Sequence, residues 1–235
     1  IAEPNIALNT IMAEELGKFA DILEQADNFD EALHKLVCDA FTQHQRIIFD
    51  GNGYSDEWKL EAVHRGLSNL PSTAECLPSY ISPKNVELVT KHGIFTEAEF
   101  HARYAIYLES YNKIVNIEAR TMVDMAMHQI LPAALAYTRD LCSTVSGKKA
   151  LCIPCKAELE LLDILSRKTD ALFGSINALS DALKSVPQDA AAASRYYHGA
   201  VIPCMNALRT HADRLEELTA KSYWPFPTYS DLLYY

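Results

Sequence analysis

Apolar side chains recur every three or four residues along most of the chain, a spacing that places them on one face of an α-helix. The stripe within residues 5–25 consists of Leu8, Met12, Leu16, Phe19 and Leu23. A second helix is expected to run from about residue 30 to 48, and its inner face consists of Leu33, Leu36, Val37, Ala40, Phe41 and His44. No segment alternates apolar and polar residues long enough to predict a strand. The pattern therefore predicts an all-α protein.

In the second half of the chain, the pattern of apolar residues predicts longer helices that pack together. Thr96 and Glu99 have the spacing of a capping box, and the helix they open is expected to reach about Val145, with a kink or break at Pro132 and an end at Ser146–Gly147. Two further helices follow, with strict apolar seams within residues 162–186 and 197–218. A short turn at Pro187 joins them, which favours antiparallel packing in a helical bundle.

Residues 49–91 are the least regular part of the pattern. Asp50–Gly53 is a strong turn signal, because Gly and Asn tolerate a positive φ. Ser55 is expected to cap a short helix that stops near Arg65–Gly66. Ser82–Pro83 begins another helix, and Gly93 ends it.

The last segment, residues 222–235, is predicted to be an extended tail. Prolines at 225 and 227 exclude a helix there, and the flanking Trp224 and Phe226 are costly to leave in water. The tail is therefore expected to lie along a groove of its own chain or of a neighbouring subunit.

Composition narrows the function classes. The 235 residues include only 8 Gly and 10 Pro, which fits long helices, and the net charge of −10 argues against a nucleic-acid partner. No apolar stretch approaches the roughly 20 residues that span a bilayer, and no signal peptide is recognisable, so no membrane partner is expected. Six scattered cysteines favour a reducing compartment, the cytoplasm. The chain begins at Ile1 without a Met, which we interpret as a cut from a longer protein.

Candidate metal-binding and redox residues are few. Cys152 and Cys155 form a lone CxxC without the further ligands that zinc needs or the βαβ pattern of a thioredoxin site. The pairs Glu31 with His34 and Glu61 with His64 have the Glu-x-x-His spacing of di-iron bundles. Glu31, however, points well away from the apolar stripe of its helix, and the second pair lies on a helix too short for a bundle core. Solvated charge pairs are the simpler interpretation.

Catalytic signatures are equally weak. His44, His128 and His211 lie on or beside apolar faces, where a lone histidine is more often hydrogen-bonded than catalytic. The turn at residues 50–53 lacks the lysine and the strand–helix context of a phosphate-binding loop, and no nucleophile elbow is present. From the residues alone we expect no catalytic, cofactor-binding or metal-binding residue in this chain.

The segment Arg46-Ile-Ile-Phe-Asp-Gly-Asn-Gly-Tyr-Ser-Asp-Glu-Trp58 resembles a segment typical of type III glutamine synthetases. Further stretches that are similar to this class are Pro4–Glu14, Leu70–Pro71, Ile81–Asn85, Lys91–Phe100 and Trp224–Tyr229. The resemblance covers nearly the whole chain. It implies an enzyme that joins ammonia to glutamate, using ATP and Mg²⁺ or Mn²⁺, in a site made between subunits.

The resemblance also implies an arrangement of the chain. Residues 1–95 would be the closing helices of the catalytic domain, residues 96–221 the C-terminal helical bundle, and residues 222–235 its tail. The catalytic, nucleotide and metal contacts of the class would lie upstream, so this chain alone is expected to be inactive and to serve assembly, with a regulatory role as a further expectation. Its partners would be the upstream catalytic region and neighbouring subunits of a homo-oligomer. The first helix would pack on the catalytic sheet, which leaves apolar surface exposed without it.

The candidate site under this interpretation is one loop, formed by Asp50, Gly51, Asn52, Gly53, Tyr54, Ser55, Asp56, Glu57 and Trp58. One hypothesis has it contact the active-site end of a neighbouring subunit. The other has it form a tight turn that is particular to the family. For the chain as a whole, the alternative is a free-standing helical interaction module without enzymatic activity.

Overall fold

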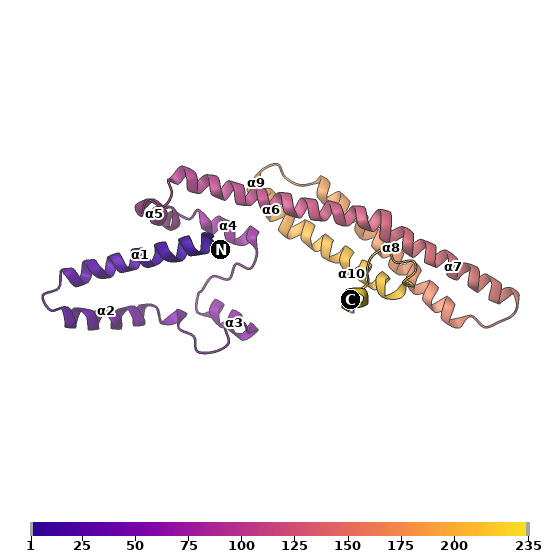
Figure 1. Cartoon of the computed structure of the whole chain (residues 1–235), viewed down its shortest axis with the longest axis horizontal. Coiled ribbons are helices and arrows are strands. Elements are labelled where there is room, and N and C mark those ends of the chain that lie inside the picture. The colour runs from indigo at the N-terminus through magenta and orange to yellow at the C-terminus, as the bar shows by residue number, and fades with distance from the viewer. Residues whose placement is uncertain (1, 234–235) are drawn as a thin grey trace. The chain divides into compact units, whose positions relative to one another are not determined.

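A computed structural model describes residues 2–233, and these contain helices and turns but no strand (Figure 1). The chain divides into two compact units, residues 1–107 and residues 108–235, and the division falls within helix α6. None of the described helices is both long and apolar enough to cross a membrane. The boundary that the sequence predicted, between residues 95 and 96, lies at the start of α6. That it separates the catalytic domain from a C-terminal domain stays a prediction.

The first unit contains six helices and part of a seventh. They are α1 (Ala2–Glu24), α2 (Phe29–Gln43), the 3₁₀ turn η1 (Gln45–Ile47), α3 (Asp56–His64), α4 (Thr73–Tyr80), α5 (Pro83–Lys91) and the first part of α6 (Glu97–Met125). Helices α1 and α2 form an antiparallel hairpin, and α1 also packs on α5 (Figure 1). Asn28 caps α2, with its side-chain oxygen accepting from the backbone N–H groups of Asp30 and Glu31.

The core of this unit is small and aromatic. Phe100 at the start of α6 stacks on Tyr80 of α4 with ring centroids 4.2 Å apart, and it also contacts Phe95. The guanidinium of Arg103 lies 4.4 Å from the centre of the Phe95 ring. Ala74, Leu77 and Val89 are the other buried apolar residues. By contrast, α2 and α3 contain no buried residue.

The second unit is a bundle of long helices. It contains the rest of α6, the π turn η2 (Ala126–Ile130), α7 (Leu131–Ala150), α8 (Lys156–Lys184), α9 (Ala190–Tyr196), the π turn η3 (Tyr197–Val201), α10 (Ile202–Leu218) and α11 (Tyr229–Leu233). Helix α8 packs along both α7 and α10 (Figure 1). Among the most deeply buried side chains are Leu165, Leu172, Ile176, Leu179 and Leu215 of the predicted seams. The all-α prediction and the C-terminal bundle are confirmed.

Both prolines that lie inside helices of the bundle, Pro132 of α7 and Pro203 of α10, are preceded by a π turn. The backbone N–H of Leu131 bonds the carbonyl of Ala126, one residue beyond the usual helical partner, just before Pro132. The N–H of Ile202 bonds the carbonyl of Tyr197 in the same way, just before Pro203. A proline lacks an N–H and its ring crowds the preceding turn, and the wider turn relieves this conflict. The predicted disruption at Pro132 is thus a π turn in a backbone that stays helical.

The end of α7 differs from the sequence-based prediction. The helix passes through Gly147 and ends at Ala150, where Cys152 takes a left-handed φ of 56°. The N–H of Ile153 then bonds the carbonyl of Lys148 at 2.9 Å, as in a Schellman motif. Predicting an end at Ser146–Gly147 was wrong, because a glycine within a helix costs only about 1 kcal/mol and packing overrides it.

Helix α4 was not predicted at all. It begins with a capping box, in which the Ser72 hydroxyl accepts from the N–H of Glu75 and the Glu75 carboxylate accepts from the N–H of Ser72. The same arrangement joins Thr96 to Glu99 at the start of α6, as predicted. The left-handed glycines that end α3 and α5, Gly66 and Gly93, also lie where the sequence predicted helix ends.

The described part of the tail, up to residue 233, lies against its own bundle. Trp224 belongs to the buried core, and Phe226 packs against it. The Tyr223 hydroxyl donates to the carboxylate of Asp140 on α7, and Lys221 pairs with Asp231. Of the two expected locations, a groove of its own chain is the one that the structure shows. The prediction of an extended tail was wrong for its last part, because residues 229–233 form the short helix α11. Residues 234 and 235 lie outside the described part.

Candidate functional site

The predicted loop is held at its base by aromatic stacking. Phe49 precedes the loop and Trp58 lies in the first turn of α3, and their rings stack with centroids 4.1 Å apart at an interplanar angle of 25°. Arg65, the residue that follows α3, places its guanidinium 5.7 Å from the Trp58 ring and 6.0 Å from the Phe49 ring. Cation–π attraction therefore supports the stack from one side.

Arg65 also fixes the backbone that enters the loop. Its guanidinium donates to the carbonyl oxygen of Ile48 at 2.8 Å and pairs with Glu61, one helical turn earlier, at 2.6 Å. The same Arg65 lowers the pKa of the Glu61 carboxyl through this hydrogen bond. One side chain thus joins the segment before the loop to the helix after it.

Two side-chain caps shape the turn itself. The Asn52 side-chain oxygen accepts from the N–H of Tyr54 at 3.0 Å, which is an Asx turn. The Ser55 hydroxyl then accepts from the N–H of Trp58 at 3.3 Å and caps α3. A hydrogen bond with Ser55 lowers the pKa of Glu57. The predicted capping role of Ser55 is confirmed.

Gly51 is required by space and not by backbone conformation. A Cβ at this position would lie 2.7 Å from the Phe49 ring, closer than real Cβ contacts allow. Gly53, two residues on, has nothing within 4 Å of the same added atom. Of the two glycines of the turn, therefore, only Gly51 is constrained by the aromatic stack.

The loop presents one large side chain to solvent. Tyr54 is 96% exposed, whereas Trp58 and Ser55 at the base are half-buried. Asp50 and Asp56 are exposed as well, and Asp56 forms an ion pair with Lys59 at 2.7 Å. The nine predicted residues thus form one turn and the first turn of α3, with Tyr54 at the exposed tip and Trp58 at the base. This arrangement suits a contact with another surface more than bond-making chemistry.

The other candidates of the sequence analysis do not converge. Cys152 is exposed, Cys155 is buried, and both are free thiols. His34 is exposed, and its ring lies 3.8 Å from the sulfur of Cys38. Glu61 pairs with Arg65 instead of forming a site with His64.

The three lone histidines have separate surroundings. His44 is exposed, and His128 contacts the Asp124 carboxylate on the surface at 2.9 Å. His211 is half-buried, with no hydrogen-bond partner for its Nδ1 among residues 2–233. Within the described part of the chain, no three His, Cys, Asp or Glu side chains could hold a metal together. The residues present therefore do not fit the divalent metal that the resemblance implies.

Ionic contacts of α1 escaped the sequence analysis. The Glu14 carboxylate accepts from Lys91 and lies 2.8 Å from the His92 ring, and Glu3 pairs with Arg103 at 2.9 Å. The hydrogen bond from Lys91, with that from His92, lowers the pKa of Glu14 to about 2. These partners are 77 to 100 residues apart in sequence, so no local pattern could reveal them.

Comparison with known proteins adds a family match. The sequence model of the family described as the Glutamine synthetase C-terminal domain matches residues 32–149. The chain is 35% identical to a glutamine synthetase of Butyrivibrio fibrisolvens, over 88% of this chain and 30% of the relative. It is 32% identical to the type-3 glutamine synthetase of Dictyostelium discoideum, over 98% of this chain and 33% of the relative.

A glutamine synthetase of Bacteroides fragilis is 29% identical, over 97% of this chain and 33% of the relative. The chain therefore spans about a third of the length of each of these relatives. The match includes the whole loop of residues 50–58, which lies inside the family region.

Proposed function

The chain belongs to the glutamine synthetase C-terminal domain family, and from this premise we propose that it is the C-terminal region of a type III glutamine synthetase and serves the assembly of that enzyme. The full-length protein would join ammonia to glutamate with ATP. The observation that carries the assembly role is the orientation of helix α1.

Helix α1 turns its polar side toward its own chain. Thr10 is only 4% exposed, and Glu14 and Glu3 on the same side are paired with residues of α5 and α6. The apolar side is open, since Leu8 is 61% exposed and Leu16 is 59% exposed. At about 100° per residue, Thr10 lies about 200° around the helix from Leu8. An amphipathic helix normally buries its apolar side. The exposed apolar side of α1 therefore supports a partner surface that lies outside residues 1–235.

Helix α2 has the same property. Phe29, Leu33, Val37 and Phe41 follow one another at four-residue spacing and are all exposed. Together with Leu8, Met12 and Leu16 of α1, they define what we call the open face of the hairpin. We assign its partner as the upstream catalytic region of the same polypeptide. The removal of this much apolar surface from water is the driving force of the contact.

The loop of residues 50–58 would act at a subunit boundary. Its base is fixed by Arg65 and the aromatic stack, while Tyr54 at its tip is fully available. A rigid loop with an exposed tyrosine is suited to an interface, because little side-chain entropy is lost when the ring is buried. We assign its contact to the active-site end of a neighbouring subunit in a homo-oligomer.

ATP and Mg²⁺ or Mn²⁺ would be bound by the upstream region. We therefore expect no ATP-dependent glutamine formation by residues 1–235 alone. We also assign the protein to the cytoplasm, because its six cysteines are free, as is usual in a reducing compartment.

Substitutions on α1 test the assembly role in the longer protein that includes the upstream region. Met12→Glu places a charge in the open face and is expected to abolish both assembly and glutamine formation. Ala13→Glu, on the adjacent exposed position outside the stripe, is the matched control and is expected to leave both intact. Full assembly and activity of the Met12→Glu protein would contradict the proposal.

A further inference from the structure

Two connections between antiparallel helices carry opposite charge (Figure 1). Residues 21–31, which we call the acidic turn, link α1 to α2 and contain five acidic residues but no lysine or arginine. Residues 148–156, which we call the basic corner, link α7 to α8 and contain three lysines but no acidic residue. The net charge of the whole chain is −10, so the basic corner is an exception on an acidic protein.

The acids of the acidic turn have no cation on their own chain to balance them. They are Asp21, Glu24, Asp27, Asp30 and Glu31, and all are exposed. None of their carboxylates has an ion pair or a hydrogen bond with another side chain among residues 2–233. Like charges this close in sequence repel one another, and a cationic surface on a partner relieves the repulsion. Ile22 beside them is 51% exposed and adds an apolar contact surface.

The basic corner presents an apolar tip that its own contacts hold in place. The N–H of Ile153 bonds the carbonyl of Lys148 at 2.9 Å, and the Lys148 ammonium pairs with Glu158 across the corner. Leu151 is 73% exposed and Ile153 is 47% exposed. A tip that is already ordered loses little entropy when a partner covers it, so the corner is suited to docking.

Both segments place charge against the dipole of their own helix. Asp21 and Glu24 lie in the last turn of α1, where the dipole disfavours negative charge and no basic residue accompanies them. Lys156 is the first residue of α8, where the dipole disfavours positive charge. Its side chain is 88% exposed, and its distance to Glu160 is 3.8 Å. The fold of one chain gives no reason for these charges, whereas a partner surface of opposite charge gives one.

We propose that the basic corner of one chain docks on the acidic turn of a second copy. Lys149 and Lys156 face the carboxylates of the turn, and Leu151 packs beside Ile22. Two basic corners would repel each other, as would two acidic turns, so the contact joins unlike surfaces. Each copy then keeps one free corner and one free turn, and the contact repeats from copy to copy. The proposal rests on the homo-oligomer proposed above, but the charges it uses lie outside the open face.

Zero-length cross-linking tests the contact in the complete chain. Exposed ion pairs contribute little energy each, so the contact alone is weak and has to be captured covalently. An equal mixture of ¹⁴N- and ¹⁵N-labelled chains is treated with a carbodiimide, which joins a lysine amine to a carboxylate, and the linked peptides are identified by mass spectrometry. We expect residues 148–156 of one isotope to be linked to residues 21–31 of the other.

Salt distinguishes this contact from association through the open face. The mixed-isotope links should weaken as sodium chloride is raised to about 1 M, where the screening length is only about 3 Å. Association through the open face is apolar and should not weaken with salt.

Charge reversals separate the contact from effects on folding. Lys156→Glu and Glu24→Lys each suit the dipole of the helix that carries them, so neither is expected to destabilise the chain. Each variant alone should form the mixed-isotope links about threefold to tenfold less. A mixture of the two variants should restore them, with the corner of the Glu24→Lys chain linked to the turn of the Lys156→Glu chain, because those two surfaces are unaltered.

Lys84→Glu is the matched control. Lys84 is likewise an exposed lysine in the first turn of a helix, α5, so the change has the same charge and the same position relative to a helix dipole. It lies outside both segments and should leave the mixed-isotope links unchanged.

Three results would overturn the proposal. One is the absence of mixed-isotope links between the two segments at low salt. Another is links within one isotope only, because the corner and the turn would then meet in a single chain. The third, in the longer polypeptide that includes the upstream region, is a corner linked only to acids outside residues 21–31. Full assembly of the Met12→Glu protein would contradict the open-face partner but leave these links expected, so the two proposals fail separately.

Discussion

The guanidinium of Arg65 donates a hydrogen bond of 2.8 Å to the carbonyl oxygen of Ile48, across 17 residues of sequence. This contact ties the strand-like entry of the loop to the end of α3 and leaves Tyr54 exposed between them. The Phe49–Trp58 stack lies against the same guanidinium, so Arg65 and the two rings together hold the base of the loop.

Replacing Arg65 with Met keeps an apolar stem but removes the donor to Ile48, the ion pair with Glu61 and the cation–π contact. We expect the loop to lose about 1 kcal/mol of local stability. The three contacts of Arg65 are partly exposed to water, and solvent reduces the net energy of each. Amide hydrogen exchange at Trp58 measures it and should become several-fold faster. Lys59→Met, which removes only a surface ion pair, should leave the rate unchanged.

Gly51→Ala should disturb the aromatic stack, because its Cβ would lie 2.7 Å from the Phe49 ring. We expect a destabilisation of about 1–3 kcal/mol and a change in the fluorescence of Trp58, measured in a Trp224→Phe background. Gly53→Ala has open space around the new atom and serves as the control. Equal effects of the two substitutions would show that the stack does not constrain the loop.

The stability of the first unit should fall as the solution is acidified. The folded pKa of Glu14 is about 2, below its ordinary value of 4.5, because Lys91 and His92 bond the carboxylate. A lowered pKa contributes stability above pH 4.5, and this contribution is lost as the pH falls from 4.5 toward 2. Urea denaturation across this window should show a shallower pH dependence in Glu14→Gln than in Glu15→Gln. Identical slopes would mean that the contact is absent in solution.

The chain by itself should self-associate, because the open face leaves large apolar side chains in water. Multi-angle light scattering is expected to show an oligomer that dissociates in a Leu16→Glu and Phe41→Glu double variant. Ala13→Glu should behave as the unaltered chain. A clean monomer of the unaltered chain at every concentration would contradict the prediction.

Most of the fold could be predicted because its determinants are local. The capping box at Thr96 and Glu99 and the left-handed glycines at Gly66 and Gly93 each act within one helical turn. Ser72 and Glu75 carry the same signal and could have predicted α4. The end of α7 could not be predicted, because a left-handed Cys152 is unfavourable on its own and is held there by the surrounding chain.

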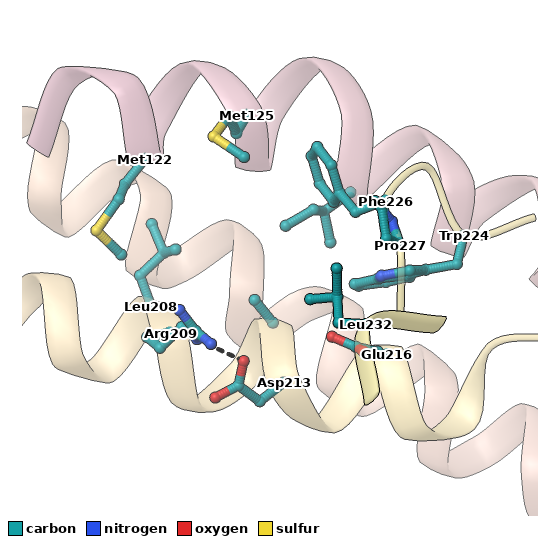
Figure 2. A pocket seen from close by; sticks show the side chains of 12 residues that line it. Met122, Met125, Leu208, Arg209, Asp213, Glu216, Trp224, Phe226, Pro227 and Leu232 are labelled. Atoms are coloured by element: carbon teal, nitrogen blue, oxygen red, sulfur yellow. Dashed lines mark hydrogen bonds and ion pairs between the residues drawn. The ribbon is translucent and has the colours of Figure 1, made fainter. Parts of the chain in front are cut away.

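In the candidate site, too, the local features could be predicted from the sequence and the long-range contacts could not. The turn of the loop was predictable from Asn52 and Ser55, whose side chains cap backbone N–H groups two and three residues later. The role of Arg65 could not be predicted, because the Ile48 carbonyl that it bonds lies 17 residues away and only folding brings the two groups together. The cavity lined by Met122, Leu208 and Trp224 (Figure 2) could not be predicted from local sequence either, since these residues come from α6, α10 and the tail and only tertiary packing brings them around one space.

Hydrogen exchange of α1 and α2 tests the central claim most directly. The rates should be compared between residues 1–235 alone and the longer polypeptide that includes the upstream region, with α8 as the internal reference. The account predicts that exchange in α1 and α2 slows markedly in the longer protein, while α8 exchanges at the same rate in both. Unchanged exchange in α1 and α2 would contradict it, because the open face would then have no partner in the enzyme.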